Sequence, residues 1–194
     1  MGRRGTAKGP PPVSPLAAVV RGALAGVVGT VALDAVNYAE YRSGGGTDAP
    51  LTWEFSGTID SWDKAPAPAQ VGRRLYEGFL QRPLPPSAAD MVNNITHWGY
   101  GMLWGAQYGI VAGSGRRRRF SGVALASVVW LSGYAVLPLA KLYKPIWEYD
   151  AKTLAKDYAG HLAFGISTAT AFSVLTARRR RGEATPSPRR APQS

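Results

Sequence analysis

The chain has 194 residues and no cysteine, which excludes disulfides, thiolate metal sites and thiol nucleophiles. It has 23 lysines and arginines against 12 aspartates and glutamates, and the net charge of +11 indicates a polyanionic partner, either nucleic acid or an anionic lipid surface. The length is enough for one domain with its own core or for a small membrane bundle.

Residues 1–13 are basic and rich in proline, which predicts a disordered tail. Ser14 and Pro15 then indicate the start of a helix, because serine caps helices and proline fits the first helical position. The next segment, 16–38, is apolar apart from two charged side chains. It is longer than the apolar part of a signal peptide and has no clear cleavage site, so we interpret it as an uncleaved membrane span.

Three more segments, 91–115, 120–140 and 158–177, contain no Asp, Glu, Lys or Arg. Each is as long as the roughly 20 helical residues that cross a bilayer. A soluble surface helix would carry charges on its outer face, and a chain of this size cannot bury four such helices on every side. We therefore predict an all-α fold in which residues 14–177 form a four-helix transmembrane bundle. The expected spans are about 16–38, 94–113, 120–140 and 157–177.

The connection 39–93 is long and is expected to be external. Within it, Val71, Leu75 and Phe79 recur at every fourth position, which predicts a short amphipathic helix that the prolines at 83, 85 and 86 bring to an end. Such a helix either packs on the bundle or lies on the outer membrane surface, and the packed arrangement is favoured.

Basic residues are concentrated on one side of the predicted bundle. The N-terminal tail, the turn after the second span and the tail 178–194, which we expect to be disordered, are rich in arginine, whereas 39–90 and 141–157 carry both signs of charge. The positive-inside rule then predicts a multi-pass inner-membrane protein with both termini in the cytoplasm. The residues that would anchor this topology are Arg116, Arg117, Arg118, Arg119, Arg178, Arg179, Arg180 and Arg181.

The arginine runs also bear on the choice of partner. They adjoin apolar spans directly and have no aromatic side chains between them. This arrangement favours anionic lipid head groups on the cytoplasmic side, and we expect no nucleic-acid partner.

Small residues recur at every fourth position in three of the predicted spans, which lets helix backbones approach closely. Where such a stripe is exposed, it would support a homo-oligomer or contact with another membrane protein. The stripe glycines are Gly22 and Gly26 in the first span, Gly101, Gly105 and Gly109 in the second, and Gly165 in the fourth.

Each stripe also carries one titratable residue toward the outer side: Asp34, His97 or His161. Asn37 lies one turn from Asp34, and Asp157 precedes His161 by four residues and is placed to orient its ring. Three interpretations stand: hydrogen bonds that fix helix register, a proton or ligand site, and a divalent-metal site at Asp34, His97 and His161. The first is favoured, and we expect no cofactor, because two histidines and one aspartate are too few to specify a metal.

Three segments carry a resemblance to a known family: "NNITHWGYGMLWGAQYG" (93–109), "DYAGHLAFGISTATAF" (157–172) and "RGALAGVVGTVALDAV" (21–36). They resemble the YagU-like family of uncharacterised bacterial inner-membrane proteins, with a Gly/Ala-rich first span and a Gly-His dipeptide, here Gly160-His161, opening a late span. The resemblance covers the four spans but neither the tails nor most of the long loop. It implies a multi-helix membrane protein and no established activity, cofactor or catalytic residue.

No nucleophile elbow, zinc-protease or phosphate-loop pattern is present. We therefore expect a membrane-embedded accessory or structural bundle rather than an enzyme. One alternative is a proton-coupled transporter or permease subunit that uses Asp34, His97 and His161, although no internal repeat or broken-helix pair is evident. The other is a metal-dependent membrane enzyme with its metal at the same three residues.

Overall fold

The computed structural model describes residues 14–55, 59, 61–116 and 121–183. Within these ranges the chain is all-α, with six α-helices and no strand, as predicted. The helices are α1 (Pro15–Ser43), α2 (Pro50–Phe55), α3 (Ala67–Leu80), α4 (Ala89–Val111), α5 (Gly122–Leu139) and α6 (Ala151–Glu183). A π-helical turn, Ala112–Arg116, follows α4.

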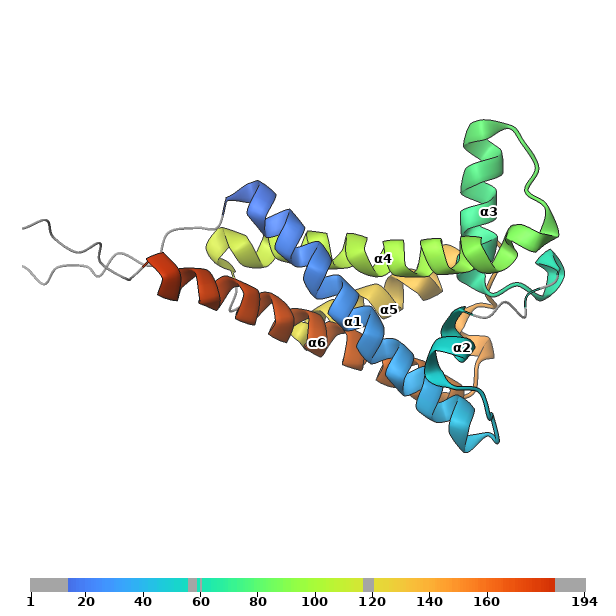
Figure 1. Cartoon of the computed structure of the whole chain (residues 1–194). Helices are drawn as coiled ribbons and strands as arrows, with labels where there is room; N and C mark the ends of the chain where they lie inside the picture. Colours follow the sequence, from blue (N-terminus) through green and yellow to red (C-terminus); the bar gives the residue numbers. More distant parts are fainter. Residues whose placement is uncertain (1–13, 56–58, 60, 117–120, 184–194) are drawn as a thin grey trace, which may run out of the picture.

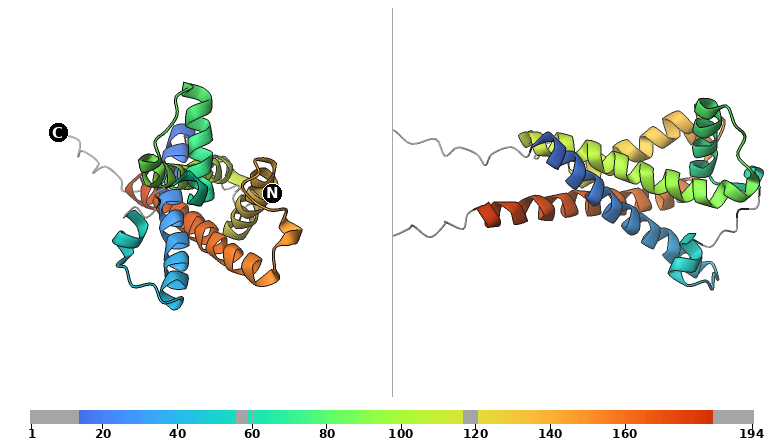
Figure 2. Two further views of the ribbon diagram at one scale, coloured as in Figure 1. Left: turned by 90° about the vertical axis from the view of Figure 1, so that its right-hand side faces the viewer. Right: turned by 45° about the horizontal axis from the view of Figure 1, so that its top comes forward.

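The long helices α1, α4, α5 and α6 alternate in direction, so α1 begins and α6 ends at the same end of the bundle (Figure 1). Helix α1 packs against both α4 and α6, and α5 packs against α6. The helices spread apart toward the opposite end, which carries α2 and α3 and is called the loop end below (Figure 2). Helix α3 stands across the direction of α4, against which it packs (Figure 1).

Two of the long helices, α1 and α5, are long and apolar enough to cross a membrane. In the part of the chain that the structure describes, α4 and α6 fall short of this hydropathy, because glycine, serine, threonine and histidine interrupt their apolar residues. The prediction of a membrane protein therefore has support from two helices.

The helices extend beyond the spans expected from the charge-free segments. Helix α4 already begins at Ala89, because 89–93 contain no proline or glycine that would delay it. Helix α6 begins at Ala151, where Asp150 caps it by accepting a hydrogen bond from the Thr153 backbone at 2.9 Å. It continues to Glu183, since arginine is a good helix former, so the first part of the expected disordered tail 178–194 is helical.

Many of the basic residues that were expected to set the topology lie outside the described part of the chain. Residues 1–13, Arg117–Arg119 and residues 184–194 lie outside the described residues. Arg116 lies in the π-helical turn and Arg178–Arg181 lie in the last turns of α6, but their side chains are likewise not described.

The expected amphipathic helix is α3, but only Val71 of its apolar stripe faces the bundle, where it lines a cavity, and the rest of the stripe is exposed. A Cβ added to Gly72 would lie 2.2 Å from Thr96 Oγ1 and 2.6 Å from Val92 of α4, so a small residue makes the contact. Leu75 is 54% exposed and Phe79 is 84% exposed. Helix α3 thus packs on the bundle through its small residues, because they allow the closer backbone approach.

The glycine stripes lie between helices of the same chain. A Cβ on Gly26 would lie 2.3 Å from the carbonyl oxygen of Gly101, and one on Gly105 would lie 2.3 Å from that of Gly22. Gly109 approaches the carbonyl oxygen of Ala18 in the same way. These contacts hold α1 and α4 together at a distance that no side chain would permit.

A second glycine contact joins α5 to α6. A Cβ on Gly165 would lie 2.2 Å from the carbonyl oxygen of Gly122, a residue that the stripe pattern did not single out. Gly29 of α1, also missed, faces Phe164 and Thr168 of α6. The stripes are therefore occupied inside one bundle, and an oligomer would need another surface.

Candidate functional site

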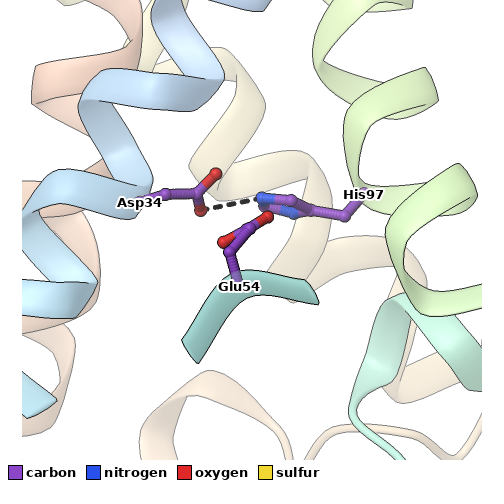
Figure 3. A group of neighbouring side chains, drawn as sticks. All are labelled: Asp34, Glu54 and His97. Atoms are coloured by element: carbon purple, nitrogen blue, oxygen red, sulfur yellow. Dashed lines mark hydrogen bonds and ion pairs between the residues drawn. The ribbon is translucent and has the colours of Figure 1, made fainter. Parts of the chain in front are cut away.

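Asp34 of α1 and His97 of α4 are in direct contact. The imidazole Nε2 of His97 lies 2.9 Å from Asp34 Oδ1, as Figure 3 shows. The pair lies just beyond the Gly26–Gly101 contact, toward the loop end, where α1 and α4 begin to diverge. The close packing of Gly26 against Gly101 therefore determines how far apart the two helices hold Asp34 and His97.

The loop helix α2 adds a third group, Glu54 (Figure 3). One ligand atom from each of Asp34, Glu54 and His97 lies within 4.8 Å of the other two. We call these residues the polar cluster. No sequence pattern pointed to Glu54, because its position depends on the path of the loop rather than on a helical repeat.

Helix α2 is held in place by aromatic contacts. Trp98 Nε1 donates a hydrogen bond to Glu54 Oε1 at 2.9 Å, and the Trp98 ring stacks on Phe55 with centroids 6.4 Å apart. Trp53 packs against Tyr38 of α1 with centroids 5.4 Å apart. Glu54 is thus fixed from both α1 and α4.

The polar cluster is shielded from water. The side chains of Asp34 and His97 are only 13% and 25% exposed, and Asp34 Oδ2 is buried with no hydrogen-bond partner. Burial raises the pKa of Glu54, and the nearby Asp34 carboxylate adds to this, while the hydrogen bond from Trp98 opposes it. Two carboxylates from different helices therefore share one weakly hydrated space.

His161 does not join this cluster. Its Nδ1 lies 2.9 Å from the backbone oxygen of Asp157 and 3.5 Å from Asp157 Oδ1, one turn earlier in α6. Trp130 of α5 donates to the other carboxylate oxygen of Asp157 at 2.9 Å. The expected grouping of Asp34, His97 and His161 therefore separates into two His–Asp pairs, because the carboxylate within the same helix is nearer to His161.

Asn37 also lies apart from the cluster. It is exposed and faces α6, where its Oδ1 lies 3.6 Å from the position that a Cβ on Gly160 would occupy. It therefore contributes to the contact between α1 and α6 rather than to the site.

One cavity of about 490 Å³ lies between α1, α4, α5 and α6, and it is reached by His97 from the first His–Asp pair and by Asp157 and His161 from the second. Aromatic and aliphatic side chains form most of the wall, and the start of α3 closes one part of it. The polar groups on the wall include His97, Asp157 and His161, and the larger apolar ones include Trp104, Trp130, Leu137 and Phe164.

The cavity reaches the surface between α4 and α5, which make little direct contact. Tyr100 of α4 and Val136 of α5 both line it and are 45% and 59% exposed. Across this gap the Tyr100 hydroxyl lies 3.2 Å from Ser132 Oγ. A molecule could therefore enter from the side of the bundle.

The chain matches no family model, no curated protein and no solved structure. The resemblance to the YagU-like family therefore stays a prediction. The chemistry of the site has to be inferred from its own geometry: a mostly apolar cavity of this size, with a few convergent polar groups, is typical of a small-molecule site.

Proposed function

We propose that this chain is a four-span membrane protein that binds a small amphipathic molecule taken up from the lipid. The observation that carries the proposal is the cavity of about 490 Å³, which is lined by aromatic side chains and by His97, Asp157 and His161 and is open between α4 and α5. Its volume falls in the range of roughly 300–1,000 Å³ that small-molecule sites occupy.

The outward faces of the long helices support a membrane setting. Helices α4 and α6 are less apolar than α1 and α5, yet all four expose aliphatic side chains, while glycines and the buried threonines Thr30 and Thr168 lie at contacts between helices. This distribution suits a bundle in lipid, because hydrocarbon offers the polar groups no partner. The exposed aliphatic residues include Leu24 and Val28 of α1, Leu103 and Ile110 of α4, Val128 and Leu131 of α5, and Ile166 and Val174 of α6.

The proposed orientation places the loop end outside. The arginine-rich sequences adjoin the start of α1, the α4–α5 turn and the end of α6, which share one end of the bundle. By the positive-inside rule this end faces the cytoplasm, where anionic head groups would bind it. The protein would then be a multi-pass inner-membrane protein with both termini in the cytoplasm.

The cavity also indicates how a ligand would lie. Its polar part would face His97, Asp157 and His161, which donate or accept hydrogen bonds, and its apolar part would contact Trp104 and Trp130. In this proposal the accessory role expected from the sequence becomes more specific: the bundle holds or presents a lipid-like molecule.

A second candidate is the proton-coupled transporter or permease subunit. It is favoured by one observation, that two histidines, each paired with an aspartate, line the same cavity. A transporter would move its substrate between the two sides of the membrane, whereas a binding protein would only retain it. Flux measurements in proteoliposomes with Asp34→Asn distinguish the two, because loss of flux in a folded variant supports transport.

Gly133 offers a direct test of the binding proposal. It lines the cavity, and no atom lies within 4 Å of a Cβ added to it, so Gly133→Leu would place a side chain in the ligand space without striking the backbone. Gly99→Leu is the matched control, because Gly99 is equally free of neighbours but is exposed and does not line the cavity.

The measurement is mass spectrometry of the small molecules that co-purify with the protein in mild detergent. We expect the wild type and Gly99→Leu to retain a species that is enriched over the bulk lipid, and Gly133→Leu to lose it. Circular dichroism and gel filtration check that both variants are folded. The proposal is wrong if the three folded proteins carry the same molecules in the same amounts.

A further inference from the structure

We propose that Asp34, Glu54 and His97 bind one divalent transition-metal ion. The three side chains come from α1, α2 and α4, and one donor atom of each lies within 4.8 Å of the others. Ligand atoms around a single such ion lie about 2.0–2.2 Å from it, hence at most about 4.4 Å apart. A shift of a few tenths of an ångström would therefore close the site, and the proposal does not depend on the ligand of the cavity.

The strongest sign of a missing partner is the unpaired oxygen of Asp34. Its Oδ1 contacts His97 Nε2, but Oδ2 is buried and has no hydrogen-bond partner among the described residues. Buried carboxylate oxygens normally have partners, because an unpaired one loses its hydration without compensation. A metal ion bound by this carboxylate would supply the interaction.

The charges of the polar cluster favour the same interpretation. Two carboxylates lie in one shielded space with a single imidazole between them. Two carboxylates held this close to each other create a negative potential that attracts a cation. A divalent ion would balance both carboxylates and bind neutral His97, with release of any proton held there.

A neighbouring residue orients one of the ligands. Trp98 Nε1 donates to Glu54 Oε1 at 2.9 Å, which leaves the other carboxylate oxygen available to an ion. Hydrogen bonds of this kind fix the orientation of metal ligands in known sites. Two oxygen donors and one nitrogen donor suit Zn²⁺, Mn²⁺ or Fe²⁺ better than a soft ion that prefers sulfur.

The ion would have a structural consequence. Glu54 lies in a six-residue helix of the long loop, whereas Asp34 and His97 lie in two of the long helices. Binding would therefore tie the loop to the bundle at the point where α1 and α4 diverge. It would also hold the His97 ring, which lines the cavity, in one orientation.

The test uses the full-length chain in mild detergent, stripped with a chelator and titrated with Zn²⁺ or Mn²⁺ by calorimetry. We expect one ion per chain, and an affinity at least about 10-fold lower in Glu54→Gln and in His97→Gln, because loss of a ligand should cost at least as much as loss of a second-sphere group. The matched controls are His161→Gln and Glu148→Gln, which change the same residue types outside the cluster and should bind as the wild type does.

Three results would overturn the proposal. These are no stoichiometric uptake by the wild type, unchanged uptake by Glu54→Gln, and equal loss in His161→Gln. If His97→Gln does not fold, Glu54→Gln still decides, since its amide oxygen can keep the bond from Trp98. Gly133→Leu should retain the metal, so failure of the metal site and failure of the ligand proposal give different results.

Discussion

Gly26 of α1 and Gly101 of α4 lie backbone against backbone, and this contact sets the distance between Asp34 and His97. A Cβ on Gly26 would lie 2.3 Å from the carbonyl oxygen of Gly101, closer than any real side chain atom approaches. The two helices diverge beyond this point, and the polar pair bridges them at 2.9 Å. The packing stripe and the polar site are therefore parts of one arrangement.

The first prediction concerns this contact. Gly26→Ala would force α1 and α4 apart, because the methyl group meets backbone that cannot move aside, and we expect a loss of about 1–3 kcal/mol of stability. Gly99→Ala meets no atom within 4 Å and should leave stability unchanged or raise it by up to about 1 kcal/mol. Thermal unfolding in one detergent measures both. Equal melting temperatures for the two variants would contradict the packing described here.

The second prediction concerns helix α3. Phe79 is 84% exposed, so Phe79→Ser should change the unfolding free energy in detergent by less than about 0.5 kcal/mol. Gly72→Leu would clash with Thr96 and Val92 and should be clearly destabilising. Chemical denaturation of the two variants checks this. The reverse order would mean that the apolar stripe, rather than the small residues, faces the bundle.

The third prediction concerns the pH dependence of stability. Because burial raises the pKa of Glu54 above its ordinary value of 4.5, the folded state keeps this proton at a pH where the unfolded state has lost it. The contribution of Glu54 to stability is therefore present at low pH and is lost as the pH rises from 4.5 through the folded-state pKa.

Glu54→Gln cannot titrate and provides the comparison. In chelator-treated protein we expect its melting temperature to rise relative to the wild type as the pH increases above 4.5. Thermal scans of both proteins over a pH series measure the difference. A difference that stays constant, or that changes in the opposite direction, would contradict the assignment of the buried carboxyl.

The fourth prediction concerns topology. Gly45 lies in an exposed turn with a φ of 96°, where an inserted reporter should be tolerated. We expect an alkaline phosphatase inserted there to be active outside the membrane, and one fused after Ser194 to be inactive. A cytoplasmic fluorescent reporter should give the reverse pattern. The opposite outcome at both sites would invert the proposed orientation.

Helical periodicity explains what the sequence could predict. Repeats of four residues placed Gly22, Gly26, Gly101 and Gly105 on contact faces, and the same faces carry Asp34 and His97 into contact. Charge-free segments located the long helices, although capping and helix propensity moved their ends. Such patterns predict contacts because, in a helix, the spacing of residues in the sequence determines the face on which their side chains lie.

Other features had no local signal. Glu54 reaches the cluster because of the path of a loop that contains no sequence repeat. Its position depends on the hydrogen bond from Trp98 and on the packing of the neighbouring Trp53 against Tyr38. His161 pairs with Asp157, as the four-residue spacing indicated, whereas its separation from Asp34 depends on how the helices pack. Tertiary contacts, rather than spacing, decide which residues of different helices meet.

The hydrogen bond between Tyr100 and Ser132 has a consequence for kinetics. Ser132 Oγ donates to the Val129 carbonyl at 2.7 Å, so the Tyr100 hydroxyl is the donor across the gap between α4 and α5. This hydrogen bond lies at the side through which we propose that a lipid-like molecule enters. If it opens and closes during entry, the bond governs residence time more than equilibrium occupancy. Tyr100→Phe would then accelerate both uptake and release of the bound molecule and leave its affinity almost unchanged.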